Sequence, residues 1–301
     1  MSEKEKVIAV VGPTASGKSA IAIEIARLVG GEVVSADSRQ VYSGLDIGTG
    51  KVTKCEMKGV PHHLLNVANP KHTISVVQYE RLATHAIRDI LKRSKVPIIC
   101  GGTGLYIDAV LTTASFPAVP PNPKLRKELE KLSAEKLFEK LQKLDPARAE
   151  TIDAKNPRRL IRAIEIAKTL GSVPERSPAI ERYNTLYIGL TLPKDELAER
   201  IHARLIARMR RGMVAEAHRL HTVGLSWKRM ESLGLEYRFL AQFLQKKLSK
   251  EKMLELLEIA IRQYAKRQMV WFKRNKSMKW FRPEEQKKLL ALVKKHLFKN
   301  K

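Results

Sequence analysis

A glycine-rich run near the start of the chain has the spacing of a phosphate-binding loop, G-x-x-x-x-G-K followed by Ser or Thr. Its residues are Gly12, Pro13, Thr14, Ala15, Ser16, Gly17, Lys18 and Ser19. An apolar run at 7–11 precedes it and a helical pattern at 20–28 follows, so backbone N–H groups and the positive end of a helix dipole are expected to converge on one phosphate group. Lys18 would add a positive charge, and the Ser19 hydroxyl is a candidate ligand for Mg²⁺. The alternative is a strand-to-helix turn that binds nothing.

Two more polar positions follow apolar runs. Asp37 comes directly after 32–36, and Thr103 lies in a second glycine-rich turn, 101–106, after the apolar run 97–100. Open α/β folds bind ligands at the carboxyl ends of their strands, which makes Asp37 a candidate site residue by position. An Asp after a strand also commonly caps a turn, and that alternative stays open. In the second turn, bare glycine backbone and a hydroxyl allow close approach to a ligand.

The elements that would hold these residues alternate between strand and helix over the first third of the chain, as in a parallel sheet. A helical period runs from 76 to 93, and the apolar run 186–190 is predicted to be a buried strand that rejoins the sheet. A proline-rich stretch at 116–123 interrupts this order. Short amphipathic helices are then expected at 125–132, 134–144 and 157–170.

We therefore predict an α/β fold with a P-loop parallel sheet flanked by helices. Residues 1–115 and 185–301 would form this catalytic core, and residues 116–184 an all-helical insertion domain. The C-terminal region is expected to be helical, with long helices at 196–211 and 251–273 and a basic tail at 287–301 that frays. The first of these helices carries three arginines at a spacing of four, which face either an anion or water: Arg200, Arg204 and Arg208.

The net charge indicates an anionic partner. The 301 residues include 57 Lys and Arg against 31 Asp and Glu, a net charge of +26. Residues 121–301 hold 43 of the basic and 21 of the acidic residues, so most of the excess lies away from the phosphate loop. A nucleic acid is the partner that such a charge favours. The alternative is a solvated Lys-rich surface, but such surfaces usually balance Lys with Glu.

Other classes of protein have little support. No apolar run approaches the roughly 20 residues of a membrane span, and residues 1–6 are too short and too charged for a secretory leader, so a cytoplasmic location without a membrane partner is expected. Cys55 and Cys100 suggest neither a disulfide framework nor a metal cluster. His62 and His63 have no third ligand spaced to join them, and we expect a structural role for both.

Taken together, the motifs resemble those of the bacterial tRNA dimethylallyltransferases, and they occur in that family's order between about residues 7 and 271. The matching segments are 12–19, 35–42 (SADSRQVY), 46–49 (DIGT), 61–64 (PHHL), 101–106 (GGTGLY), 156–159 (NPRR) and 262–268 (RQYAKRQ). Two positions depart from the family pattern. Asn66 stands where Asp is usual, and residues 234–237 read GLEY where a GYKE-like run is usual.

The resemblance implies transfer of a dimethylallyl group from dimethylallyl diphosphate to N6 of adenosine 37, in tRNAs that read codons beginning with U. The product would be N6-(dimethylallyl)adenosine, with release of diphosphate. In this reaction the phosphate loop holds the diphosphate with Mg²⁺, Lys18 neutralises its charge, and no ATP is consumed. Asp37 would accept the proton of the exocyclic amine, and Thr103 is the second catalytic position that the resemblance implies.

The resemblance also implies a set of tRNA contacts, in which the helical insertion closes over the anticodon stem-loop of a tRNA bound by a monomer. The base must leave the anticodon-loop stack, and such a base is read by hydrogen bonds to its edges and by packing. The implied contacts are Asp37, Ser38, Arg39, Gln40, Thr103, Arg126, Arg158, Arg159, Leu160, Ile161 and Arg162.

Two rival functions use the same loop. One is a kinase for a small molecule or a nucleoside, and the other is a nucleic-acid-binding NTPase in which the loop controls affinity. Both require ATP turnover. Apart from the run that ends at Asp37, no apolar strand ends in the acidic residue that holds Mg²⁺ in such proteins, and the strand at 97–100 ends in glycines.

Overall fold

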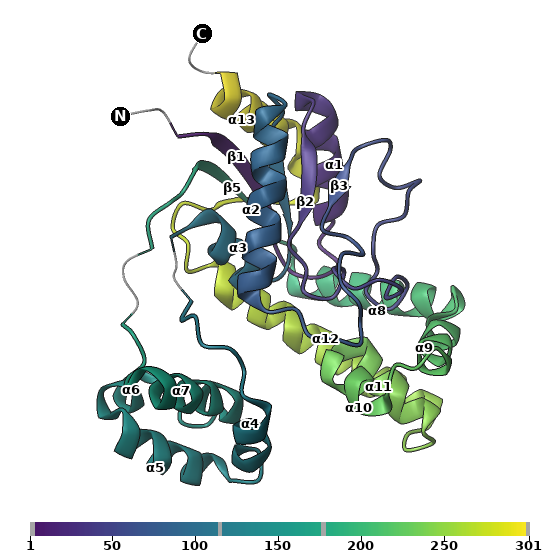
Figure 1. Ribbon diagram of the computed structural model, residues 1–301. Coiled ribbons are helices and arrows are strands. Elements are labelled where there is room, and N and C mark those ends of the chain that lie inside the picture. Colours follow the sequence, from purple (N-terminus) through teal and green to yellow (C-terminus); the bar gives the residue numbers. More distant parts are fainter. Residues whose placement is uncertain (1–3, 114–115, 176–178, 299–301) are drawn as a thin grey trace. The chain divides into compact units, whose positions relative to one another are not determined.

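The computed structural model describes residues 4–113, 116–175 and 179–298 (Figure 1). The chain forms two compact units: Met1–Thr113 with Glu181–Lys301, here called the core unit, and Ala114–Ile180, here called the insertion. The insertion ends a few residues before the predicted boundary at 184. The reason is that Arg182 N–H already bonds to the Leu111 carbonyl (2.8 Å) and Glu181 bridges to Thr112, so the returning chain joins the core unit at once.

The core unit is built on a six-stranded parallel sheet, in agreement with the predicted fold class. The strand order is β3-β2-β4-β1-β5-β6. The strands are β1 (Lys6–Val11), β2 (Glu32–Ser35), β3 (His62–His63), β4 (Pro97–Gly101), β5 (Asn184–Leu190) and β6 (Lys279–Phe281). The four longer strands are almost completely buried, which explains their continuous apolar sequences.

Strand β3 shows what the two histidines do. His63 Nε2 lies 2.7 Å from Glu32 Oε2, and His62 Nδ1 lies 2.9 Å from the Val60 carbonyl oxygen. Hydrogen bonds from Arg93 hold the pKa of the buried Glu32 carboxyl well below its usual range, with a further bond from Lys95. His63 therefore belongs to the cluster of side chains around Glu32, and His62 bonds to the backbone, so both have structural roles.

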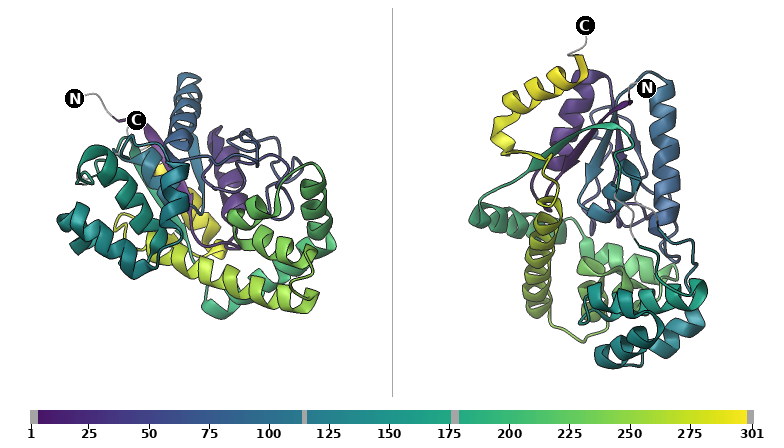
Figure 2. Two further views of the ribbon diagram at one scale, coloured as in Figure 1. Left: turned by 60° about the horizontal axis from the view of Figure 1, so that its bottom comes forward. Right: turned by 90° about the vertical axis from the view of Figure 1, so that its left-hand side faces the viewer.

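Helices cover both faces of the sheet (Figure 2). Alternate β1 residues face opposite ways: Ile8 and Val10 pack with α1 (Lys18–Val29) and α13 (Gln286–Phe298), whereas Ala9 and Val11 pack on the side of α2 (Val76–Lys92) and α3 (Gly104–Leu111). Helix α13 corrects the prediction of a fraying tail at 287–301. Its Leu289 and Val293, four residues apart, are fully buried against the sheet; residues 299–301 lie outside the described part of the chain.

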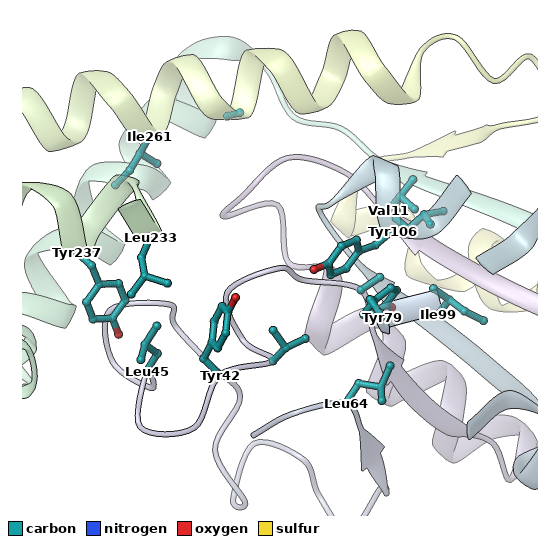
Figure 3. Packing of buried hydrophobic residues seen from close by; sticks show 14 of the residues in the cluster. Val11, Tyr42, Leu45, Leu64, Tyr79, Ile99, Tyr106, Leu233, Tyr237 and Ile261 are labelled. Atoms are coloured by element: carbon teal, nitrogen blue, oxygen red, sulfur yellow. The ribbon is translucent and has the colours of Figure 1, made fainter. Parts of the chain in front are cut away.

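The core on the α2 side continues into the C-terminal helices, as the sticks in Figure 3 show from Tyr106 and Tyr79 to Tyr42, Leu233 and Tyr237. These helices are α8 (Lys194–Arg210), α9 (Met213–Thr222), α10 (Trp227–Leu233), α11 (Leu235–Leu244) and α12 (Lys250–Phe272); a short 3-10 turn, Pro283–Glu285, precedes α13. Among the described helices, none is both long and apolar enough to cross a membrane.

The insertion consists of four short helices around its own small core. They are α4 (Pro123–Leu129), α5 (Ala134–Leu144), α6 (Pro146–Thr151) and α7 (Pro157–Leu170). Asn122, Ser133, Asp145 and Asn156 cap their N-termini by accepting backbone hydrogen bonds. Leu137, Leu141, Leu160 and Ile164 are fully buried between the helices.

Candidate active site

The phosphate loop joins β1 to α1 with backbone geometry that depends on glycine. Gly17, which caps α1, has a φ of 87°, and Gly12 has a φ of 146°. A Cβ atom on Gly12 would lie 2.7 Å from the Leu190 carbonyl oxygen, so a larger residue would strain this position in two ways. The Ser16 side chain is buried, and its hydroxyl has no hydrogen-bond partner among the described residues. Such a group indicates a place for a ligand oxygen.

Two basic side chains converge on this loop. Lys18 Nζ donates to the Pro13 carbonyl (2.6 Å), and the Arg204 guanidinium, from α8, donates to Thr14 Oγ1 (3.4 Å) and to the Gly50 carbonyl (3.1 Å). Burial lowers the pKa of Lys18 to about 8, and the charge of Arg204 acts in the same direction. No carboxylate in the described ranges forms an ion pair with Arg204. Two desolvated cations without a carboxylate partner favour an anionic ligand.

Asp37 lies directly after β2, and only one of its two carboxylate oxygens is hydrogen-bonded within the described structure. Oδ1 accepts hydrogen bonds from the backbone N–H groups of Arg39 (2.8 Å) and Gln40 (3.2 Å). The turn-capping alternative is therefore correct as far as this oxygen goes. Oδ2 accepts no hydrogen bond from any residue that the structure describes, and it remains available to a substrate.

Thr103 and Tyr264 lie beside Asp37. Thr103 Oγ1 accepts from the Ser38 N–H (3.0 Å), and its own N–H donates to the Ala36 carbonyl (3.1 Å), which ties the ends of β2 and β4 together. Burial raises the pKa of Tyr264 to about 12, the negative charge of Asp37 adds to this, and a hydrogen bond with Thr103 opposes it. The structure thus brings the two predicted catalytic positions together with a half-buried tyrosine from α12, which the sequence analysis named only as part of the segment 262–268.

Gln268, also on α12, is a second residue that the sequence reasoning did not single out. Its Oε1 accepts from the Thr14 N–H (2.8 Å), and its Nε2 donates to the Gly102 carbonyl (2.9 Å), so one buried amide joins both glycine-rich sites. A Cβ atom on Gly102 would collide with this amide, which is why the turn needs glycine there. Two signals were available: its place in the matching segment 262–268, and a polar residue on the apolar face that Ala265 and Phe272 share.

The DIGT segment, 46–49, is held in place by a buried carboxylate from α9. Glu216 accepts hydrogen bonds from the backbone N–H groups of Asp46 (3.0 Å), Ile47 (2.7 Å) and Gly48 (2.9 Å), and from the Tyr237 hydroxyl (2.7 Å). These bonds give the loop a fixed shape. Because Arg204 donates to Gly50 just beyond it, the loop also helps to aim Arg204 at the phosphate loop.

The three evenly spaced arginines of α8 have three different environments. Arg200 pairs with Glu196 (2.7 Å), Arg204 lies at the phosphate loop, and Arg208 is buried and donates to the Gly48 carbonyl (2.6 Å). Arg208 also pairs with Glu236 at 3.0 Å. The three arginines were predicted to face either an anion or water. Arg200 and Arg208 instead bond to groups of the protein, and only Arg204 lies at the candidate site.

Within the insertion, the predicted tRNA contacts separate into bonded, buried and exposed residues. Arg126 makes two hydrogen bonds to the buried Glu165 (2.7 and 2.6 Å), and Arg162 bonds to Glu165 (3.3 Å) and to the Val119 carbonyl (2.8 Å). The side chains of Leu160 and Ile161 are buried in the insertion's core, so a contact between RNA and these two residues would involve their backbone. Arg158 and Arg159 are exposed on α7. Arg159 makes one long ion pair, 3.9 Å, with the Asp153 carboxylate.

Comparisons with known proteins decide the family. The family model described as IPP transferase matches residues 40–275. The chain belongs to the IPP transferase family. It is 42% identical over 268 residues to tRNA dimethylallyltransferase 2 of Citrifermentans bemidjiense, covering 89% of this chain and 86% of that protein. It is 41% identical over 287 residues to the tRNA dimethylallyltransferase of Thermomicrobium roseum, covering 93% and 87%.

Solved structures agree with this membership of the IPP transferase family. The full-length tRNA isopentenylpyrophosphate transferase of Bacillus halodurans superposes with a TM-score of 0.75 at 35% identity, covering 98% of each chain. A eukaryotic dimethylallyltransferase described as acting on tRNA superposes with a TM-score of 0.74 at 28% identity, covering 89% of this chain and 70% of that one. The fold and the order of motifs are therefore those of prenyl-transferring enzymes.

The two departures from the family pattern have visible local roles. Asn66 Oδ1 accepts from the buried Lys51 Nζ at 2.5 Å, and the same ammonium also bonds to Asp46 (2.7 Å). In the 234–237 run, Glu236 pairs with Arg208, and the Tyr237 hydroxyl donates to Glu216. Both positions support the loop at 46–51.

The donors at the site suit Mg²⁺ only if a substrate provides most of the ligands. No group of three or more His, Cys, Asp or Glu side chains in the described part of the chain could hold a metal ion. Mg²⁺ is commonly bound through one or two protein oxygens together with phosphate oxygens and waters. The Ser19 hydroxyl, in the first turn of α1, is the protein oxygen that the loop offers, and the fit with a diphosphate-bound Mg²⁺ is good.

Proposed function

We propose that this chain transfers a dimethylallyl group from dimethylallyl diphosphate to tRNA, at N6 of adenosine 37 in tRNAs that read codons beginning with U. The observation that carries the proposal is the half-used carboxylate of Asp37, which lies near the desolvated ammonium of Lys18 at the phosphate loop. A site with a free acceptor oxygen beside an anion cradle suits a reaction that takes a proton from an amine and releases diphosphate. The names of the relatives support the same reaction.

The leaving group would be held by the phosphate loop. The loop's N–H groups, Lys18 and Arg204 take up the negative charge that develops as the bond between C1 of the prenyl group and the diphosphate oxygen breaks. Gln268 keeps the loop in register with the turn at Gly102. Mg²⁺, held by Ser19 and the diphosphate, would supply further neutralisation of that charge.

The nucleophile would be the exocyclic amine of adenosine 37. Its nitrogen forms the new bond to C1 of the prenyl group, and its proton passes to Asp37 Oδ2, while Oδ1 stays bonded to the N–H groups of Arg39 and Gln40. Those two bonds orient the carboxylate so that Oδ2 points away from the turn and can accept the proton. Thr103 fixes the Ser38 end of the same turn. We propose that the adenine is read by this segment, Asp37 to Gln40, and by Thr103.

The tRNA itself would be bound by basic side chains that are exposed and make at most a long ion pair within the described structure. In the insertion these are Arg158 and Arg159, while Arg126 and Arg162 support the helices that carry them. A monomeric state and a cytoplasmic location stay predictions.

The direct test is a transfer assay with dimethylallyl diphosphate labelled in its prenyl carbons. We expect label in tRNA transcripts that carry adenosine 37 and none in a matched transcript with guanosine 37, which lacks the exocyclic amine at that ring position. ATP hydrolysis is measured beside it. ATP turnover without transfer of label would favour the kinase or NTPase alternatives, for which the comparisons give no support.

A further inference from the structure

A groove on the outer face of α2 lies apart from the phosphate loop and has no role in the chemistry above. Its volume is about 420 Å³, and it is lined by Val77, Glu80, Arg81, Thr84, His85, Arg88 and Arg182. All of these except Arg182 lie on α2, on the face opposite the buried residues Tyr79, Ala83 and Ile90. In the right-hand view of Figure 2, α2 lies on the opposite side of the sheet from α1 and α13.

The charges in this groove are unbalanced. Arg182 pairs with Glu80 (2.7 Å), but Arg81, His85 and Arg88 make no ion pair with any residue in the described ranges. These three are spaced by four and three residues and are exposed on one stripe of the helix. Arg81 and Arg88 therefore have no carboxylate partner within the described structure and are available to an anion.

Two uncharged residues of the groove add to this pattern. The Thr84 hydroxyl is buried and lacks a hydrogen-bond partner among the described residues. Val77 is 46% exposed at the end of the stripe, where an apolar side chain gains nothing from water. A plain solvated helix face explains the arginines and Val77, but it explains neither the concave shape nor the unpartnered Thr84 hydroxyl.

We propose that this groove binds the sugar-phosphate backbone of the RNA substrate. The stripe from Val77 to Arg88 extends over roughly 16 Å of helix, long enough for consecutive phosphates to meet Arg81 and Arg88. Arginine suits phosphate because its planar donors match phosphate oxygens. The choice of RNA as the anion rests on the proposed function, whereas the anion-binding character of the groove rests on its own residues.

The test is the salt dependence of tRNA affinity in the variant Arg81→Gln with Arg88→Gln. Each phosphate contact contributes about 0.7 to 0.9 to the slope of log affinity against log salt, so the slope should fall by about 1.4 to 1.8 and tRNA affinity by about tenfold near physiological salt. The affinity for dimethylallyl diphosphate and the rate at saturating tRNA should not change. The matched control is Lys287→Gln with Lys294→Gln, which removes the same charge at the same spacing from exposed positions of α13.

A second readout locates the ligand. Arginine-specific modification followed by mass spectrometry should show tRNA protecting Arg81 and Arg88. A slope and affinity equal to those of the α13 control would overturn the proposal, as would protection by millimolar inorganic phosphate but not by tRNA. If the wild-type chain binds tRNA through the groove yet transfers no prenyl group, the proposed function fails while the groove assignment stands.

Discussion

The core unit and the insertion use the same kinds of charged side chain in opposite ways. In the insertion, both oxygens of Glu165 are taken by Arg126, and the Asn122 N–H and Arg162 bond to the same carboxylate. In the core unit, Asp37 has one oxygen without a partner in the described structure, and Arg204 donates only to a hydroxyl and a carbonyl. The insertion uses these charges for its own stability, whereas the core unit keeps them available for a ligand.

This difference shows that a charged residue within a functional motif does not necessarily bind a ligand. Arg126 and Arg204 are both arginines near predicted site residues, but only one has a buried carboxylate partner. Neutralising Arg126 should therefore act on folding, and neutralising Arg204 on binding. Four experiments follow, from the largest expected effect to the smallest.

The largest effect is expected for Asp37→Asn. Asn can still accept the turn hydrogen bonds with its one oxygen, but it cannot take a proton, so we expect turnover to fall by about 10² to 10⁴. The free energy of unfolding, obtained from a melting curve, should change by less than about 1 kcal/mol, since Asn caps turns nearly as well as Asp. Single-turnover rates with prebound tRNA measure the first quantity. Turnover close to that of the wild type would show that another group is the base.

Arg126→Gln should destabilise the insertion. The buried Glu165 would lose its two closest bonds, which we expect to cost about 2 kcal/mol, or about 30-fold in the local folding equilibrium. Amide hydrogen exchange in α7 measures this locally. The control is Arg158→Gln on the same helix, where protection should stay unchanged. Equal protection in both variants would mean that the Glu165 cluster contributes nothing to stability.

The affinity for dimethylallyl diphosphate should depend on pH through Lys18. Its pKa of about 8 in the free protein lies below the ordinary lysine value, so the ammonium loses its proton as pH rises above about 8 and regains it when the diphosphate binds. Affinity should be flat below pH 8 and fall by about tenfold at one pH unit above it. Calorimetry in buffers of different ionisation enthalpy detects the proton uptake. In Lys18→Arg the dependence should disappear, and its persistence would assign it elsewhere.

The smallest effect is expected for Gln268→Glu. Glutamate cannot donate to the Gly102 carbonyl, and it adds negative charge beside the phosphate loop, so kcat/KM should fall by about fivefold, which corresponds to about 1 kcal/mol. Gln263→Glu, at an exposed position of the same helix, is the control for added charge. If the two variants behave alike, Gln268 does not position the loop.

The sequence was enough to predict the sheet and the central site. Parallel strands buried on both faces give continuous apolar runs, so the strands that carry Val7, Val34, Ile98 and Ile188 were predictable, as was the meeting of the phosphate loop with Asp37 and Thr103 at their carboxyl ends. Strands β3 and β6 were missed because two or three residues show no period and pairing with neighbours defines them.

The supporting residues could not be predicted for a different reason. Glu216 bonds to a backbone N–H that is 168 residues away in sequence, and Gln268 to one that is 254 residues away. A local sequence pattern can mark such a residue as unusual, but it does not identify a partner so far away in the chain. The helical tail was misjudged because its many lysines concealed a short apolar stripe, Leu289 and Val293, that needs the sheet to be buried. In the insertion, a motif of arginines did not reveal that Glu165 neutralises two of the predicted contacts.

The division between a diphosphate site in the core unit and RNA contacts on exposed arginines is tested most directly by one set of binding measurements. Lys18→Ala and the double variant Arg158→Gln with Arg159→Gln are each titrated with dimethylallyl diphosphate and with tRNA. We predict that Lys18→Ala weakens only diphosphate binding, by at least about tenfold, because a charge-assisted contact is lost. The double variant should weaken only tRNA binding and lower its salt slope by about 1.4 to 1.8. Loss of tRNA binding in Lys18→Ala with diphosphate binding intact would contradict the account.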